Sequence, residues 1–189
     1  RAVTGVSDTF RGRFCAVPFG VDTEVFKPRN KRTVRTKLKL PRNALIIGYI
    51  GRVTAWNKMD LAPLLEVFRG VLTATERTDV YLYIIGREQQ KGYIELLKAE
   101  AARLGIAQRV RFITKHKNKD IPLYYSVCDV FVSPCDHVQE TFGITPIEAM
   151  SSGVPVVVSD WDGYKETVLE GETGHRIPTY WHACASYVD

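Results

Sequence analysis

The chain has 189 residues, of which 45% are hydrophobic and 25% are charged. This composition is typical of one globular domain and excludes a disordered or fibrous chain. No apolar run reaches roughly 18 residues and the first residues lack the layout of a signal peptide, so we expect a cytoplasmic protein. The net charge of +5 suits an anionic ligand, a nucleic acid or an anionic membrane surface, without choosing among them.

The four cysteines, Cys15, Cys128, Cys135 and Cys184, have no C-x-x-C spacing. Cys128 and Cys135 flank a strongly apolar stretch, where free thiols pack as small hydrophobic side chains. The four histidines also lack the spacing of metal ligands. We therefore expect neither a disulfide nor a metal site.

Residues 27–42 form a strongly basic segment ahead of the first predicted strand. The segment carries eight basic residues and no acidic one, and it lacks the interleaved aromatic residues that stack on single-stranded bases. We interpret it as a short solvated helix that Pro41 closes. A surface for a phosphate-rich partner or for anionic lipid remains the alternative.

Strand and helix signals alternate after residue 44, which is typical of βαβ units. The expected strands are short, mostly apolar runs at residues 45–50, 80–85, 110–113, 129–133 and 154–159. Apolar residues at helical spacing predict helices over residues 61–72 and 94–104, and shorter helices are expected at 120–128 and 163–170. Continuous apolar strands suit a sheet that is buried on both faces. The sequence therefore predicts an α/β fold, a Rossmann-like parallel sheet with helices on both faces.

The most informative stretch is DHVQETFGITPIEAMSSGVPVVVSD, residues 136–160. In this stretch Thr145 is a good N-cap, Pro146 suits the first helical position, and Glu148 completes a capping box three residues after Thr145. A helix start at the carboxyl edge of a parallel sheet favours phosphorylated ligands, because its free amides and its dipole attract anions. Gly143 lets the backbone approach such a ligand closely.

Two glutamates, Glu140 and Glu148, should flank this helix start, one from the loop and one from the first turn. Their carboxylates could accept hydrogen bonds from sugar or ribose hydroxyls. The alternatives remain open, because a capping-box glutamate needs no ligand and Glu140 suits an ordinary exposed loop.

The first predicted strand is followed by two cations, Arg52 and Lys58, on the same sheet edge. Together they could neutralise a diphosphate, and the alternative is two solvated surface cations. The run from Gly48 to Gly51 is not G-x-G-x-x-G, so a dinucleotide fingerprint is missing. Gly86-Arg87 is a weaker candidate for a further loop at this edge.

Three segments resemble the retaining GT-B glycosyltransferases of the group 1 (family 4) type. PFGVDTEVFKP (18–28) is similar to the family's entry to its C-terminal domain, and GRVTAWNK (51–58) is similar to its phosphate loop. ETFGITPIEAMSSGVPVVVSD (140–160) resembles its E-x7-E signature, which is highly specific. The resemblance implies the C-terminal half of a GT-B fold and transfer of a hexose from a UDP- or GDP-sugar to a hydroxyl acceptor, with retention and without a metal or other cofactor.

The resemblance also implies residue roles. The implied site consists of Gly51, Arg52, Lys58, Glu140, Gly143, Ile144, Thr145 and Glu148. Arg52 and Lys58 would bind the donor diphosphate together with the amides of residues 143–145. Glu140 would contact the donor sugar and Glu148 the ribose, and Arg52, Lys58 and Glu140 would form the catalytic group. Glu166 would help to shape the rim.

The chain departs from the family pattern at three places. Met59 stands where the family often has glycine, Gly86-Arg87 replaces an acidic Gly-x-Gly loop, and SPCDHVQ ahead of Glu140 is longer and more polar than usual. These departures bear on the identity of the substrate.

For the domain organisation we expect residues 1–13 to be a remnant of a linker or of an N-terminal domain. Residues 14–189 would be the nucleotide-sugar-binding domain, truncated at its C-terminus. The expected partners are the donor, the missing acceptor-binding domain and a peripheral membrane contact, but no nucleic acid. The isolated domain should bind donor and be nearly inactive.

The same residues are compatible with two other functions. One is an epimerase-like GT-B enzyme or a non-catalytic sensor of nucleotide sugars. The other is an interaction module that binds nucleic acid or anionic lipid through Lys31, Arg32, Arg35 and Lys37.

Overall fold

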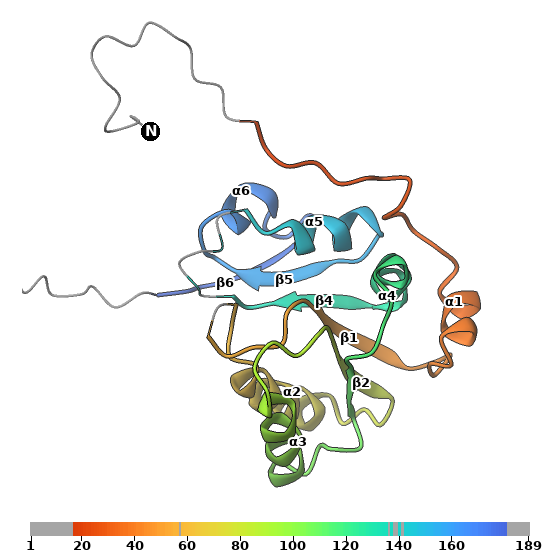
Figure 1. Cartoon of the computed structure of the whole chain (residues 1–189), viewed down its shortest axis with the longest axis vertical. Helices are drawn as coiled ribbons and strands as arrows, with labels where there is room; N and C mark the ends of the chain where they lie inside the picture. Colours follow the sequence, from red (N-terminus) through yellow and green to blue (C-terminus); the bar gives the residue numbers. More distant parts are fainter. Residues whose placement is uncertain (1–16, 57, 136, 138–139, 141, 181–189) are drawn as a thin grey trace, which may run out of the picture.

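The computed structural model describes residues 17–56, 58–135, 137, 140 and 142–180 (Figure 1). Over this part of the chain, six parallel strands form one sheet in the order β3-β2-β1-β4-β5-β6. The strands are β1 (Leu45–Ile50), β2 (Val80–Ile85), β3 (Val110–Ile113), β4 (Val130–Ser133), β5 (Val156–Ser159) and β6 (Gly174–Ile177). The helices are α1 (Lys31–Lys37), α2 (Ala62–Thr75), α3 (Tyr93–Arg103), α4 (Ile121–Val127), α5 (Ile144–Ser151) and α6 (Tyr164–Thr167), with a 3₁₀ turn at Asn118–Asp120.

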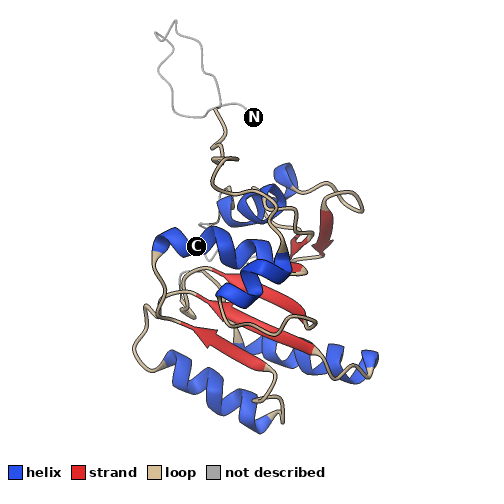
Figure 2. Cartoon of the chain, turned by 90° about the vertical axis from the view of Figure 1, so that its right-hand side faces the viewer, coloured by secondary structure: helices blue, strands red, loops and turns tan. Residues whose placement is uncertain are grey.

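Helices cover both faces of the sheet. Helices α2 and α3 lie on one side of the strands, whereas α5 and α6 lie on the other (Figures 1 and 2). Each side has its own buried cluster, with Leu65 and Phe68 of α2 in the first and Tyr125 of α4 in the second. Strand β1 contributes to both clusters, because successive side chains of a strand point to opposite faces of the sheet. Tyr49 therefore packs in the first cluster and Ile50 in the second. The predicted fold class is confirmed.

All five expected strands are present, and β6 is an additional one. This strand has only four residues and lies at the sheet edge, where His175 is exposed. A short edge strand with polar side chains lacks the apolar run that reveals a central strand. The sequence therefore offered no clear signal for it.

The basic segment contains the predicted helix, α1, but the interpretation of this helix as fully solvated is wrong. Arg35 is only 4% exposed, and its guanidinium donates to the carbonyl oxygens of Val127 and Ala44 at 2.7 Å each. It also pairs with the Asp129 carboxylate at 2.6 Å, as Lys31 does at 2.8 Å. Two of the four cations considered for a nucleic-acid or lipid surface therefore attach α1 to the sheet.

Cys128 and Cys135 are free and buried in the core, as expected for small hydrophobic side chains. Cys15, Cys184 and the proposed boundary at residue 13 lie outside the described residues. Within the described part of the chain, no cluster of three or more His, Cys, Asp or Glu side chains could hold a metal ion. None of the described helices has the length and apolar character needed to cross a membrane.

Candidate functional site

The candidate site lies where the strand order reverses. Strand β1 pairs with β2 on one side and with β4 on the other, so the chain leaves β1 and β4 in opposite directions across the sheet. The loops that follow these strands therefore diverge at the carboxyl edge of the sheet. Such a switch point is the usual place for a ligand in an open α/β sheet.

Helix α5 begins at this edge, but not with the predicted cap. The N-cap is Gly143, with φ +73°, and Thr145 lies inside the helix, so the predicted capping box is wrong. A β-carbon at Gly143 would lie 1.9 Å from the Tyr164 ring, which leaves room only for glycine. The Thr145 hydroxyl is buried near Tyr164 and makes no hydrogen bond of normal geometry to a described residue.

Glu148 does not turn back to cap the helix. Its carboxylate accepts a hydrogen bond of 2.7 Å from the hydroxyl of Tyr125, which is fully buried in α4. Burial raises the pKa of Glu148 above its usual value, and the Tyr125 hydrogen bond acts in the opposite direction. Glu148 lines a pocket with several polar walls, which we call the polar pocket. Its other polar and glycine residues include Gly51, Arg52, Arg87, His116 and Thr145.

Arg52 reaches this pocket from the loop after β1. The buried Tyr49 donates a hydrogen bond of 2.8 Å from its hydroxyl to the Arg52 carbonyl oxygen, and this contact holds the loop backbone. The Arg52 side chain itself is exposed. Arg52 thus lines the pocket, and the buried Tyr49 holds its backbone.

Lys58 and Glu140 form an ion pair, and Lys58 lines a second pocket rather than this one. Their side chains are 9% and 16% exposed, so neither is the ordinary surface residue that the alternative interpretations required. The Lys58 ammonium also lies 3.4 Å from the Tyr164 hydroxyl. Burial is the main cause that lowers the pKa of Lys58.

The structure adds His116, which the sequence did not assign to the site, and it also places Arg87 of the weaker Gly86-Arg87 candidate there. Both ring nitrogens of His116 are buried without a hydrogen-bond partner among the described residues, in a side chain that lines the pocket. Arg87 lines the same pocket and donates to the Asn118 side chain at 3.3 Å. Glu166, predicted to help shape the rim, is exposed on α6. The only sequence signal for His116 was its position after the third predicted strand.

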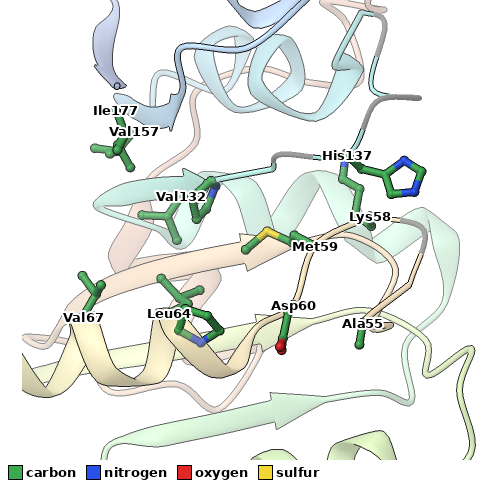
Figure 3. Close-up of a pocket in the computed structure, with 12 residues that line it drawn as sticks. Ala55, Lys58, Met59, Asp60, Leu64, Val67, Val132, His137, Val157 and Ile177 are labelled. Carbon is green, nitrogen blue, oxygen red and sulfur yellow. The ribbon is translucent and has the colours of Figure 1, made fainter. Parts of the chain in front are cut away.

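A second pocket lies on the α2 side of the Lys58 loop (Figure 3). Its walls are mainly apolar and include Met59, Leu64, Val67, Val132, Val157 and Ile177. Apart from Lys58 and His137, these walls offer no basic side chain to a diphosphate. We therefore assign the candidate anion site to the polar pocket at the start of α5.

Solved structures share this fold. The chain matches the Anabaena protein HepE, solved with UDP and glucose, with a TM-score of 0.71 and 25% identity over 83% of this chain and 41% of that one. It also matches the C-terminal domain of the group 1 glycosyl transferase LpcC from Francisella tularensis, with a TM-score of 0.67 and 24% identity over 84% of this chain and 80% of that one. The fold is thus the Rossmann-like α/β fold of a GT-B domain.

Residues 30–189 match the family described as glycosyl transferases group 1, and the chain belongs to this family. It is 35% identical to the lipopolysaccharide core mannosyltransferase LpsB of Rhizobium meliloti over 82% of this chain and 43% of that protein. It is 32% identical to the D-inositol 3-phosphate glycosyltransferase of Stackebrandtia nassauensis over 85% of this chain and 36% of that protein. The chain spans less than half the length of these relatives.

Proposed function

We propose that this chain is the donor-binding domain of a retaining glycosyltransferase, which moves a hexose from a nucleoside-diphosphate sugar to a hydroxyl acceptor. The observation that carries the proposal is the convergence of Arg52, Glu148 and the start of α5 on one pocket. The buried Lys58–Glu140 ion pair is connected to the same helix start through Tyr164. Group 1 family membership, the UDP held by HepE and the mannosyltransferase LpsB support a nucleotide sugar as donor.

The difficult step is departure of the diphosphate. As the bond from the anomeric carbon to the phosphate oxygen breaks, negative charge grows on the leaving phosphate. The Arg52 and Lys58 cations and the amides of residues 143–145 stabilise this charge, and we propose that no metal is needed. A diphosphate leaves with little protonation, so the two glutamates act in recognition rather than as an acid–base pair.

Glu148 suits the ribose because Tyr125 already uses one side of its carboxylate, which leaves acceptor positions that face the pocket. His116 and Arg87 line the part of the pocket toward the loop after β3, where the nucleotide base would lie. A base or ribose group there would satisfy the unpartnered ring nitrogens of His116.

Lys58 and Glu140 are held together by their ion pair. We propose that donor binding exchanges this ion pair for two new contacts, one from Lys58 to the diphosphate and one from Glu140 to the sugar hydroxyls. UDP without a sugar replaces only the first contact, so it leaves a buried carboxylate without its counter-charge.

The exchange predicts an unusual result for Glu140→Gln. Because glutamine does not hold the Lys58 ammonium by charge, we expect UDP to bind more tightly by about 1 kcal/mol, or roughly fivefold. The advantage of a UDP-sugar over UDP should shrink at the same time, and the melting temperature without ligand should fall because Lys58 loses its buried partner. Calorimetric titration with both ligands measures these changes.

Glu148→Gln is the matched control, because this glutamate is bonded to the Tyr125 hydroxyl and not to a cation. It should bring no gain in affinity for UDP. Equal or weaker binding of UDP to the Glu140→Gln variant would contradict the exchange.

The central experiment is calorimetric titration of the protein with UDP- and GDP-sugars. We expect binding of at least one donor, and we expect the isolated domain to bind it while catalysing very little, because the reacting centre closes only against the acceptor-binding domain. If no nucleotide bound at millimolar concentration, the proposed function would be wrong. Product analysis with the full-length protein separates glycosyl transfer from epimerisation and from simple sensing.

We also propose a cytoplasmic protein with a peripheral membrane contact, since Arg32 and Lys37 of α1 remain exposed after Arg35 is buried. Co-sedimentation with anionic vesicles tests this contact. Binding that is insensitive to salt, or the absence of binding, would argue against it.

A further inference from the structure

Tyr164 lies beneath the candidate site and touches both of its halves. It is the first residue of α6 and is fully buried. Its ring fills the space below the start of α5, where a β-carbon on Gly143 would collide with it. Its hydroxyl lies 2.9 Å from the Ser133 hydroxyl and 3.4 Å from the Lys58 ammonium. One side chain therefore connects the phosphate-binding helix start with the lysine of the opposite loop.

We infer that Tyr164 is a positioning residue that holds the Lys58 ammonium toward the start of α5. This inference rests on the proposed function and gives a role to Tyr164, which lies two residues before Glu166, the only residue of this segment that the sequence assigned to the site. Tyr164 acts through Lys58 and contacts no substrate itself.

The chemistry of the contact supports this role. A lysine ammonium has three protons to donate, and the described partners of Lys58 are the Glu140 carboxylate and the Tyr164 oxygen. The phenol can give its own proton to Ser133 and accept from Lys58. Burial raises the pKa of Tyr164 above its usual value, so the phenol stays neutral.

A neutral acceptor has an advantage over a carboxylate at this position. Glu140 orients Lys58 but neutralises its positive charge. That charge is needed to bind the diphosphate. Tyr164 orients the ammonium without cancelling its charge, so Lys58 stays in place when Glu140 turns to the sugar hydroxyls. The lysine therefore keeps one fixed partner through the exchange.

The pH dependence of nucleotide binding tests this role. Glu140 and Tyr164 contact the Lys58 ammonium, and Cys135 and Arg52 act on it electrostatically. His137 and Asp60 line the second pocket together with Lys58. Burial already lowers the pKa of Lys58. The phenol oxygen stabilises the protonated form, so its removal lowers this pKa further. Binding that needs the protonated lysine is then lost at a lower pH.

The experiment compares the wild-type protein with Tyr164→Phe, which keeps the ring below Gly143 and removes only the hydroxyl. UDP affinity is measured by calorimetry from about pH 6 to about pH 10. At the acidic end we expect a small loss of affinity in the variant, because Lys58 is protonated there but less well oriented. Toward alkaline pH we expect the variant to lose binding at a lower pH than the wild type, with affinity about tenfold weaker within that range. Ser133→Ala is the control, since it leaves the phenol beside Lys58, and its alkaline loss should match that of the wild type.

A second measurement needs no nucleotide. Carbon NMR of lysines labelled at Cε follows the titration of Lys58 in the free protein, and we expect a lower pKa in Tyr164→Phe. If that variant is unstable because the Ser133 hydroxyl is left unpaired, the double variant Tyr164→Phe/Ser133→Ala removes both hydroxyls and answers the same question.

An unchanged Lys58 pKa, or UDP binding that is weakened equally at every pH, would overturn the role of Tyr164. Wild-type protein that binds no nucleotide, despite a lower Lys58 pKa in the variant, would overturn the proposed function and leave the contact itself established.

Discussion

Replacement of Arg52 by alanine in the full-length protein is expected to lower turnover by about 10²- to 10³-fold, or roughly 3 kcal/mol of transition-state stabilisation. Arg52 lines the same pocket as Glu148 and the start of α5, where we propose that charge develops on the leaving phosphate. Its side chain is exposed, so the variant should fold with a stability change within about 0.5 kcal/mol. Steady-state kinetics with a saturating donor, together with thermal unfolding, measures both effects.

Arg69→Ala is the matched control, because Arg69 is also exposed but lies on α2, outside the polar pocket. It should leave turnover unchanged. Near-normal turnover in Arg52→Ala would remove this residue from the phosphate site and would weaken the proposed mechanism as a whole.

Replacement of Arg35 by methionine is expected to destabilise the domain by about 3 kcal/mol. Methionine fills the space but leaves the carbonyl oxygens of Val127 and Ala44 without their donor, and it removes one of the two cations that neutralise Asp129. Urea unfolding followed by circular dichroism measures the change in the free energy of unfolding. Arg32→Met on the same helix is the control and should cost less than about 0.5 kcal/mol, since Arg32 is exposed.

The contacts of Asp129 with Lys31 and Arg35 also predict how acid changes the stability of the domain. Burial alone would raise the pKa of Asp129, but hydrogen bonds from Lys31, the Ile46 amide and Arg35 outweigh burial and bring this pKa below its ordinary value of 3.8. A lowered carboxylate pKa contributes stability above the unfolded-state value and loses it as pH falls through the folded-state value. The stability difference between wild type and Arg35→Met should therefore narrow below about pH 4. A difference that stayed constant with pH would contradict the role of Asp129.

Local sequence features predicted most of the framework. Five of the strands are continuous apolar runs between polar or glycine-rich turns. Such runs are stable mainly in a sheet whose two faces are both buried. The helix start near Gly143 was also predictable, because the loop, the glycine and the apolar strand follow one another in the chain. The N-cap residue was not predictable in the same way. The helix is capped by Gly143 in a left-handed conformation, two residues before Thr145, which the capping-box pattern indicated.

The amino-acid sequence by itself determined the fold class, the strands that carry the site and the segments that resemble the group 1 family, because these depend on neighbouring residues. Only the tertiary structure decided how the side chains pair. Lys58 meets Glu140 across 82 positions of the chain, Tyr125 meets Glu148 across 23, and Tyr164 meets Lys58 across 106. Such contacts depend on strand order, register and burial, which bring distant residues to one edge of the sheet. For the same reason Arg35, one cation among eight in a basic segment, is a buried residue that attaches a helix to the sheet.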